Sequence, residues 1–240
     1  MVLKKSFKNF ILKCLNKIYI VHNLFIKQKY FLKRSSYSHS GEDLFILKKF
    51  KRKGFYVDVG CHHPTRLNNC HLLYSKGWRG VNIDINKISI DFFNFVRKKD
   101  INICKAVSLK KGLTKYYYDK PLSLYNSLVK SKDLNKVEKI KSDRLENILD
   151  ATKYKNQKID FLSIDAEGKD FEVLKSLNFR KYKPKFICIE IWGKNKDKDF
   201  NLHNNVIYKY LTKKNYKLVF NKRENYIFLN KLLKFDKVVK

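Results

Sequence analysis

The feature that most constrains the fold is an alternation of short apolar runs with helical patterns, which begins at residue 55. The apolar runs are rich in Val, Ile and Phe with few polar interruptions, which is typical of strands buried on both faces of a parallel sheet. Five such strands are predicted, at residues 55–59, 81–85, 101–107, 159–165 and 186–192. Helices are predicted between them, at residues 65–77, 87–99, 143–151 and 171–177. The pattern predicts an α/β fold, a mostly parallel sheet with helices on both faces.

The end of the chain completes this sheet. A helix is predicted at 202–214, followed by strands at 216–220 and 225–229 that a short polar turn joins. Such a pair predicts an antiparallel edge and brings the sheet to seven strands. An extra, half-exposed strand is expected at 113–118. In sheets of this kind ligands bind beyond the carboxyl ends of the strands, where the strand order reverses.

Three of the buried strands end in an acid: Asp58, Asp84 and Asp165. A carboxylate there costs desolvation free energy unless a partner compensates it. Each acid alone could cap the next helix. Three on one sheet edge indicate a ligand crevice, and an acid after the second strand is where ribose hydroxyls are bound. Gly60 allows a tight turn close to the ligand.

The turn after the first strand has two interpretations. A zinc site would need Cys61, His62, His63, Cys70 and His71 to converge. Their spacing lacks the paired-cysteine pattern of structural zinc sites, so a cofactor-binding turn is favoured. In that turn His63, or the pair Asn68 and Asn69, would contact the cofactor. His62 and Pro64 stand where a dinucleotide fingerprint needs glycine, so NAD is disfavoured.

Length and charge narrow the class further. The 240 residues suit one main domain, and 54 Lys and Arg against 22 Asp and Glu give a formal net charge of +32. This charge attracts polyanions, but it comes mostly from lysines spread along the chain, whereas nucleic-acid readers favour arginine. Five scattered cysteines indicate reduced thiols and a cytoplasmic protein, peripheral to the membrane if the N-terminus binds lipid.

The first 35 residues differ from the remainder, so the chain divides into a basic amphipathic helical extension (1–35) and the main domain (36–240). The apolar stretches between lysines are too short for a transmembrane span, and no signal-peptide cleavage site follows them. The apolar face of this helix has three candidate partners: its own domain, a second subunit in a homodimer, and an anionic membrane surface.

The run "FYVDVGCHHPTRLNNCHLLYSKGWRGVNIDIN", with "SHSGEDLFI" before it and "IDFLSIDAEGKDFEVLKSL" and "PKFICIEI" after it, resembles the FkbM family of S-adenosylmethionine-dependent methyltransferases. The resemblance implies a Rossmann-like class I methyltransferase fold and O-methylation of a sugar or glycan hydroxyl. It implies these roles by position: Asp58 and Gly60 in the cofactor loop, Asp84 on the ribose, Ala106 and Val107 at the adenine, and Asp165 and Glu167 at the reaction centre.

Methyl transfer to a hydroxyl needs a positioned base or a divalent metal that acidifies the acceptor. Asp165 and Glu167 are the first candidates, with Glu190 and His203 behind them, and the two carboxylates could equally bind Mg²⁺ or Mn²⁺. The loop at 119–135 is expected to contribute to the acceptor pocket. Two other functions stay open: an RNA methyltransferase, and a non-catalytic basic protein of this fold that binds membranes or nucleic acid.

Overall fold

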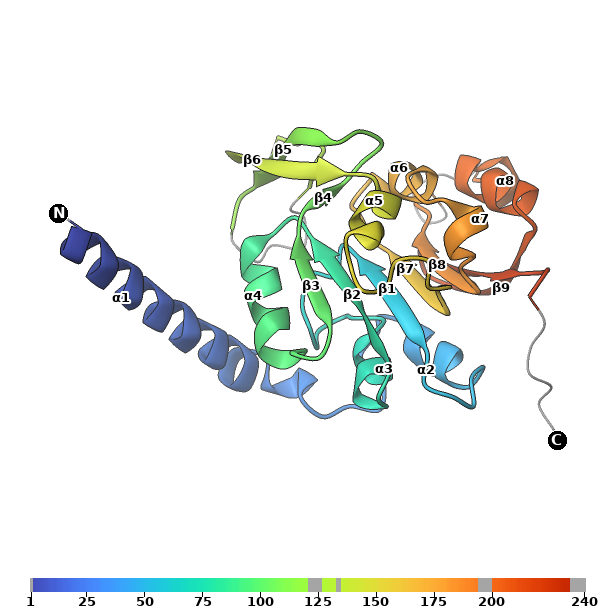
Figure 1. Ribbon diagram of the computed structural model, residues 1–240. Coiled ribbons are helices and arrows are strands. Elements are labelled where there is room, and N and C mark those ends of the chain that lie inside the picture. Colours follow the sequence, from blue (N-terminus) through green and yellow to red (C-terminus); the bar gives the residue numbers. More distant parts are fainter. Residues whose placement is uncertain (1, 121–126, 133–134, 194–199, 234–240) are drawn as a thin grey trace.

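The computed structural model describes residues 2–120, 127–132, 135–193 and 200–233. Its main sheet has seven strands in the order β3-β2-β1-β7-β8-β10-β9 (Figure 1). These strands are β1 (Phe55–Val59), β2 (Arg79–Asp84), β3 (Ile101–Cys104), β7 (Phe161–Ile164), β8 (Phe186–Glu190), β9 (Tyr216–Lys222) and β10 (Asn225–Asn230). Neighbouring strands are parallel except for β10, which runs antiparallel to both β8 and β9. The predicted seven-stranded sheet is confirmed, with its reversed strand one position in from the edge.

Helices cover both faces of this sheet. The face that carries Val57 and Val59 packs against α5 (Leu145–Asp150), α6 (Asp170–Lys175), α7 (Phe179–Tyr182) and α8 (Val206–Lys213). The face that carries Tyr56 packs against α2 (Glu42–Leu47) and α3 (His71–Ser75). A further helix, α4 (Lys87–Val96), contacts β2 and β3. Successive residues of a buried strand therefore serve two cores, which explains why the strands are apolar throughout.

A second, three-stranded sheet departs from the sequence-based prediction. Residues 101–107 do not form one strand. Strand β3 ends at Cys104, Lys105 belongs to neither strand, and the next two residues form β4 (Ala106–Val107). This short strand pairs with β6 (Lys136–Asp143), which pairs with β5 (Gly112–Tyr118) in the order β4-β6-β5. Strand β6 was not predicted because much of it is Lys and Glu, and these side chains are largely exposed.

Two predicted helices are shorter than expected. The helix predicted at 65–77 is limited to α3, since the residues before it form the turn after β1. The helix predicted at 202–214 is divided into a 3₁₀ turn (Leu202–Asn204) and α8.

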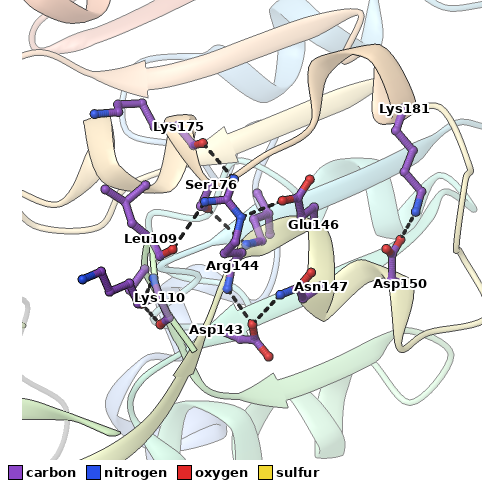
Figure 2. A network of polar contacts seen from close by, with 12 residues as sticks. Leu109, Lys110, Asp143, Arg144, Glu146, Asn147, Asp150, Lys175, Ser176 and Lys181 are labelled. Atoms are coloured by element: carbon purple, nitrogen blue, oxygen red, sulfur yellow. Dashed lines mark hydrogen bonds and ion pairs between the residues drawn. The ribbon is translucent and has the colours of Figure 1, made fainter. Parts of the chain in front are cut away.

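Arg144 joins the small sheet to the helical layer. It follows β6, its Nε lies 2.6 Å from Glu146 Oε1, and its guanidinium also donates to the carbonyl oxygens of Leu109 and Lys175 at 3.3 and 3.4 Å (Figure 2). Asp143 accepts from the backbone N–H of Arg144 and from the amide of Asn147. One side chain therefore links the loop after β4, the start of α5 and the end of α6.

The N-terminal helix α1 (Val2–Val21) projects from the body of the molecule (Figure 1). A π-helical turn (His22–Lys27) and a 3₁₀ turn (Lys29–Phe31) follow it. Ile20 and Leu24 pack on Phe92 of α4, and the amide of Asn16 donates to Asp91 at 2.9 Å. Within the described residues, no helix combines the length and apolar character needed to cross a membrane.

A fully buried arginine holds the turn after β1 in place. Arg97, directly after α4, donates from Nη2 to the Pro64 carbonyl at 2.7 Å and to Asn68 Oδ1 at 2.5 Å. Its Nη1 donates to Asn82 Oδ1 of β2 at 3.2 Å. Its guanidinium also lies over the Phe93 ring, 4.8 Å from the centroid. Strand β2, helix α4 and the turn after β1 thus share one cation.

We therefore expect Arg97→Met to lower the free energy of unfolding by about 3 kcal/mol or more, because it leaves several buried oxygens without a donor. Denaturant unfolding followed by circular dichroism measures this change. Arg180→Met, at an exposed arginine of α7, is the matched control and should change stability by less than about 0.5 kcal/mol. Equal stability of the two variants would contradict the structural role of Arg97.

Candidate active site

A cavity opens at the carboxyl ends of β1, β2, β7 and β8, where the strand order reverses between β1 and β7. Its empty space is about 1060 Å³, including the part open to solvent. The residues that line it come from both halves of the sheet and from the loops at this edge: His39, Val59, Gly60, His62, Leu67, Asn69, Ile83, Asp84, Ile85, Asn86, Lys105, Val107, Leu128, Asp165, Ala166, Glu167, Val173, Glu190 and Asn225. This is the crevice that the sequence predicted at this edge of the sheet.

Gly60 brings the two halves of the sheet into contact. Its φ is +75°, and a Cβ atom at this position would lie 1.7 Å from the carbonyl oxygen of Asp165. Its N–H donates to the Ile83 carbonyl at 2.9 Å. A side chain would therefore force β1 and β7 apart, and without one the backbone is open to close approach by a ligand.

Asp84 is held in a fixed orientation at the end of β2. Its Oδ2 accepts the backbone N–H of His62 at 2.8 Å, and its Oδ1 accepts that of Asn86 at 2.7 Å. Burial raises the pKa of Asp84 to about 6, although these backbone N–H groups oppose the shift. Each carboxylate oxygen retains a lone pair toward the cavity side, so the group can accept two neighbouring hydroxyls of a ribose.

Three carboxyl groups meet on the opposite wall, at Asp165, Glu167 and Glu190. Burial raises the pKa of Glu190 to about 8 and that of Glu167 to about 7, with nearby carboxylates adding to both shifts. Asp165 is exposed to the open cavity, and partial desolvation, together with the charges of Glu190 and Glu167, holds its pKa well above its usual range. Glu190 Oε2 is buried and has no hydrogen-bond partner among the described residues. This wall would stabilise a cation or accept a proton.

The loop after β7 places Glu167 through an unusual backbone conformation and is closed by Asp170. Glu167 has a φ of +46°, which is unusual for a residue with a side chain, and its carbonyl accepts the Ser127 hydroxyl at 3.0 Å. Asp170 accepts the backbone N–H groups of Ala166 and Gly168 and so closes the loop after β7. The loop is therefore fixed by contacts at both of its ends.

Three of the predicted cofactor residues lie behind the cavity wall. Asp58 is buried in β1 and accepts from Asn68 Nδ2 at 3.0 Å, while Asn68 Oδ1 accepts from Arg97. His63 turns away from the cavity, toward Asn23 at 3.4 Å and against the Phe92 ring. These residues support the turn, and none of the three lines the cavity.

Two other predicted residues also lie away from the cavity lining. Ala106 is fully buried, whereas its neighbour Val107 lines the cavity. His203 is exposed on the 3₁₀ turn, packs on the ring of Tyr208, and is not among the cavity residues. Of the loop expected to border the acceptor, Leu128 lines the cavity, and residues 121–126 and 133–134 lie outside the described part of the chain.

Several lining residues were missed by sequence reasoning. His62, not His63, faces the cavity, because a φ of +47° at His62 turns the backbone between the two imidazoles. Burial and the nearby Arg66 lower the pKa of His62 to about 4, so this imidazole is neutral at physiological pH. His39, Asn86 and Lys105 join the site from loops and Asn225 from the start of β10, and no local motif marked them.

The described residues contain no cluster of three or more His, Cys, Asp or Glu side chains arranged to hold a metal ion. The five Cys and His residues weighed for zinc are divided between opposite sides of the turn. His62 lies on the cavity side, whereas Cys61 packs with Ile90 and Phe93, and Cys70 packs in the core beneath α3.

The reversed strand order, the glycine turn and the acid after β2 define a nucleotide-cofactor-binding α/β protein. The chain belongs to the FkbM methyltransferase family, because the family model of the methyltransferase FkbM domain matches residues 58–218. It is therefore an S-adenosylmethionine-dependent methyltransferase with the Rossmann-like class I fold.

Solved structures show distant similarity. A TehB-like SAM-dependent methyltransferase from Corynebacterium glutamicum is 10% identical, with 81% of this chain and 89% of that chain covered and a TM-score of 0.41. The 16S rRNA methylase ArmA is 12% identical, with 91% and 97% covered and a TM-score of 0.44. A search of curated proteins gives no match.

The residues present fit S-adenosylmethionine. Asp84 can accept the ribose hydroxyls, and Gly60 leaves room for the backbone to approach the ligand closely. The unpartnered oxygen of Glu190 and its neighbouring carboxyls can face the cationic sulfonium. Val107 and Ile85 offer apolar contact for the adenine ring of the cofactor.

We expect Asp84→Asn to weaken S-adenosylmethionine binding by about 100-fold, because hydroxyl bonds to a charged acceptor contribute about 1.5–3 kcal/mol each. Isothermal titration calorimetry measures this loss. The wild-type affinity should also fall as pH drops below 6, where Asp84 becomes protonated, and the variant should lack this step. Asp91→Asn, an acid of α4 that contacts Asn16 and Lys87 and does not line the cavity, is the control and should bind as the wild type does. Unchanged binding by Asp84→Asn would refute the ribose contact.

Proposed function

We propose that this methyltransferase transfers the methyl group to a hydroxyl oxygen of a sugar or glycan. The observation that carries the proposal is the carboxyl wall of the cavity, where burial raises the pKa values of Glu167 and Glu190 to about 7 and about 8. A general base works best with a pKa near the working pH, and an alcohol acceptor needs such a group to take its proton.

Glu190 is the best-placed base in this wall. Its side chain lines the cavity and its buried Oε2 accepts no hydrogen bond from the described residues, so we assign its carboxyl group to accept the hydroxyl proton as the oxygen attacks. S-adenosylmethionine supplies the electrophilic methyl group when bound. Glu167 lines the same cavity, and burial together with the charge of Asp170 raises its pKa to about 7.

The remaining lining supports a polyhydroxylated acceptor. Side-chain amides and the neutral imidazole of His62 can donate and accept hydrogen bonds without imposing a charge. The amides that line the cavity with His62 are Asn69 on the turn after β1, Asn86 after β2, and Asn225 at the start of β10. Sugars present many hydroxyls of both donor and acceptor character, which this kind of lining matches. The resemblance to methyltransferases that act on glycans and natural products points the same way.

We expect Glu190→Gln to lower kcat by about 10²–10⁴-fold and leave S-adenosylmethionine affinity within about threefold of wild type. Transfer of a labelled methyl group to a panel of mono- and oligosaccharides measures kcat, with RNA as a parallel acceptor. The wild-type rate should rise with pH up to about 8, because Glu190 must be ionised to act. Glu172→Gln, an acid of α6 that pairs with Lys169, is the control and should retain wild-type kcat.

Full activity of Glu190→Gln would overturn the assignment of the base, and methylation of RNA but of no sugar would overturn the acceptor class. A chelator arm separates the base from a metal mechanism. Activity that EDTA abolishes and Mg²⁺ or Mn²⁺ restores would assign the carboxyl wall to metal binding instead.

A further inference from the structure

One face of the projecting helix α1 contacts the domain, and the opposite face is exposed. Asn16, Ile20 and Asn23 face the domain, through Asp91, Phe92 and His63 respectively. Phe7, Ile11, Leu15 and Ile18 are 66%, 41%, 56% and 64% exposed. Intervals of four, four and three residues place these four side chains along one stripe, on the side opposite to Asn16 and Ile20. The domain therefore leaves this apolar stripe uncovered.

The stripe is part of a larger apolar surface. Phe25, Ile26 and Tyr30 continue it at the root of the helix and are 51%, 62% and 69% exposed. The part of α1 before its contacts with α4 spans about 20 Å at 1.5 Å per residue. Contiguous apolar surface of this extent on an otherwise charged protein marks an interaction site.

The charge of the segment identifies its partner. Residues 1–41 contain eight lysines and one arginine, and the first acid of the chain is Glu42. We propose that α1 docks the enzyme on an anionic membrane surface, with its apolar stripe inserted among the acyl chains and its lysines at the lipid headgroups. This interaction is separate from the methyl-transfer site and does not depend on the acceptor proposed above.

Two other partners fit the segment less well. A second copy of α1 would cover the stripe, but it would bring two acid-free cationic segments together with no counter-charge. Nucleic acid would match the positive charge, but a phosphate backbone offers nothing to bury Leu15 or Ile18. A lipid surface satisfies both the charge and the apolar stripe.

Vesicle co-sedimentation of the full-length protein tests the proposal. We expect binding to phosphatidylcholine vesicles that contain phosphatidylserine, and little binding to phosphatidylcholine alone. The double variant Leu15→Gln/Ile18→Gln should bind the anionic vesicles at least about tenfold more weakly, because two inserted side chains are lost. Glutamine is a good helix former, so α1 should persist, and circular dichroism and S-adenosylmethionine binding check that the variant is folded.

A matched control removes two exposed apolar side chains elsewhere. Leu113 and Val137 are 66% and 56% exposed on β5 and β6, so Leu113→Gln/Val137→Gln should bind vesicles as the wild type does. Equal binding by the α1 variant and this control, or no vesicle binding by the wild type, would overturn the proposal. A dimer in light scattering that Leu15→Gln/Ile18→Gln dissociates, without vesicle binding, would assign the stripe to a second copy.

Discussion

The geometry of the active site depends on Arg97, a buried cation that does not line the cavity. Arg97 is fully buried behind the turn after β1, where its guanidinium donates to Pro64, Asn68 and Asn82. Asn68 in turn donates to Asp58, so the carboxylate of β1 and the arginine share one amide. This chain of contacts keeps a strongly bent turn in one conformation, and the turn carries Gly60 and the His62 N–H that orients Asp84. Buried hydrogen bonds beneath the turn therefore hold the cavity wall in place. Apolar side chains at these positions would not fix the orientation of the turn, because they form no directional contacts.

The carboxyl wall of the cavity, by contrast, consists of acids that no cation among the described residues neutralises. The charges of Glu190 and Glu167 raise the pKa of Asp165, and that of Glu167 raises the pKa of Glu190. No arginine or lysine ion pair among those the structure describes involves these three carboxyl groups. Such a cluster costs stability when ionised, because each carboxyl keeps its proton above its ordinary pKa. Binding of a sulfonium cation would lower that cost and favour the ionised forms. Stability and function thus conflict at this wall, as is common where an active site prepares charge for a ligand.

The sequence predicted the sheet well because its strands are buried on both faces, and the repeated apolar runs leave few alternatives. The acids at the carboxyl ends of β1, β2 and β7 also indicated the edge of the sheet where the cavity lies, although only Asp84 and Asp165 line it and Asp58 lies behind its wall. The features that the sequence could not predict depend on local backbone torsion angles and on long-range pairing. The positive φ of His62 decides which of two adjacent histidines faces the ligand, and neither residue type signals it. Strand β6 and the lining residues His39 and Asn225 depend on long-range pairing, which no local pattern contains.

The distribution of charge divides the molecule into two electrostatic regions. The formal net charge of +32 resides in lysines that lie mainly at the surface, whereas seven acids, among them Asp58, Asp84 and Asp170, are almost fully buried. The exterior therefore attracts anions, and the carboxyl wall of the cavity repels them. A phosphate or carboxylate group can approach the surface but meets like charge at Glu167 and Glu190 once these carboxyl groups ionise, at about pH 7 to 8. A neutral hydroxyl meets no such barrier, so an acceptor that carries anionic groups at a distance from its reactive hydroxyl would satisfy both regions at once.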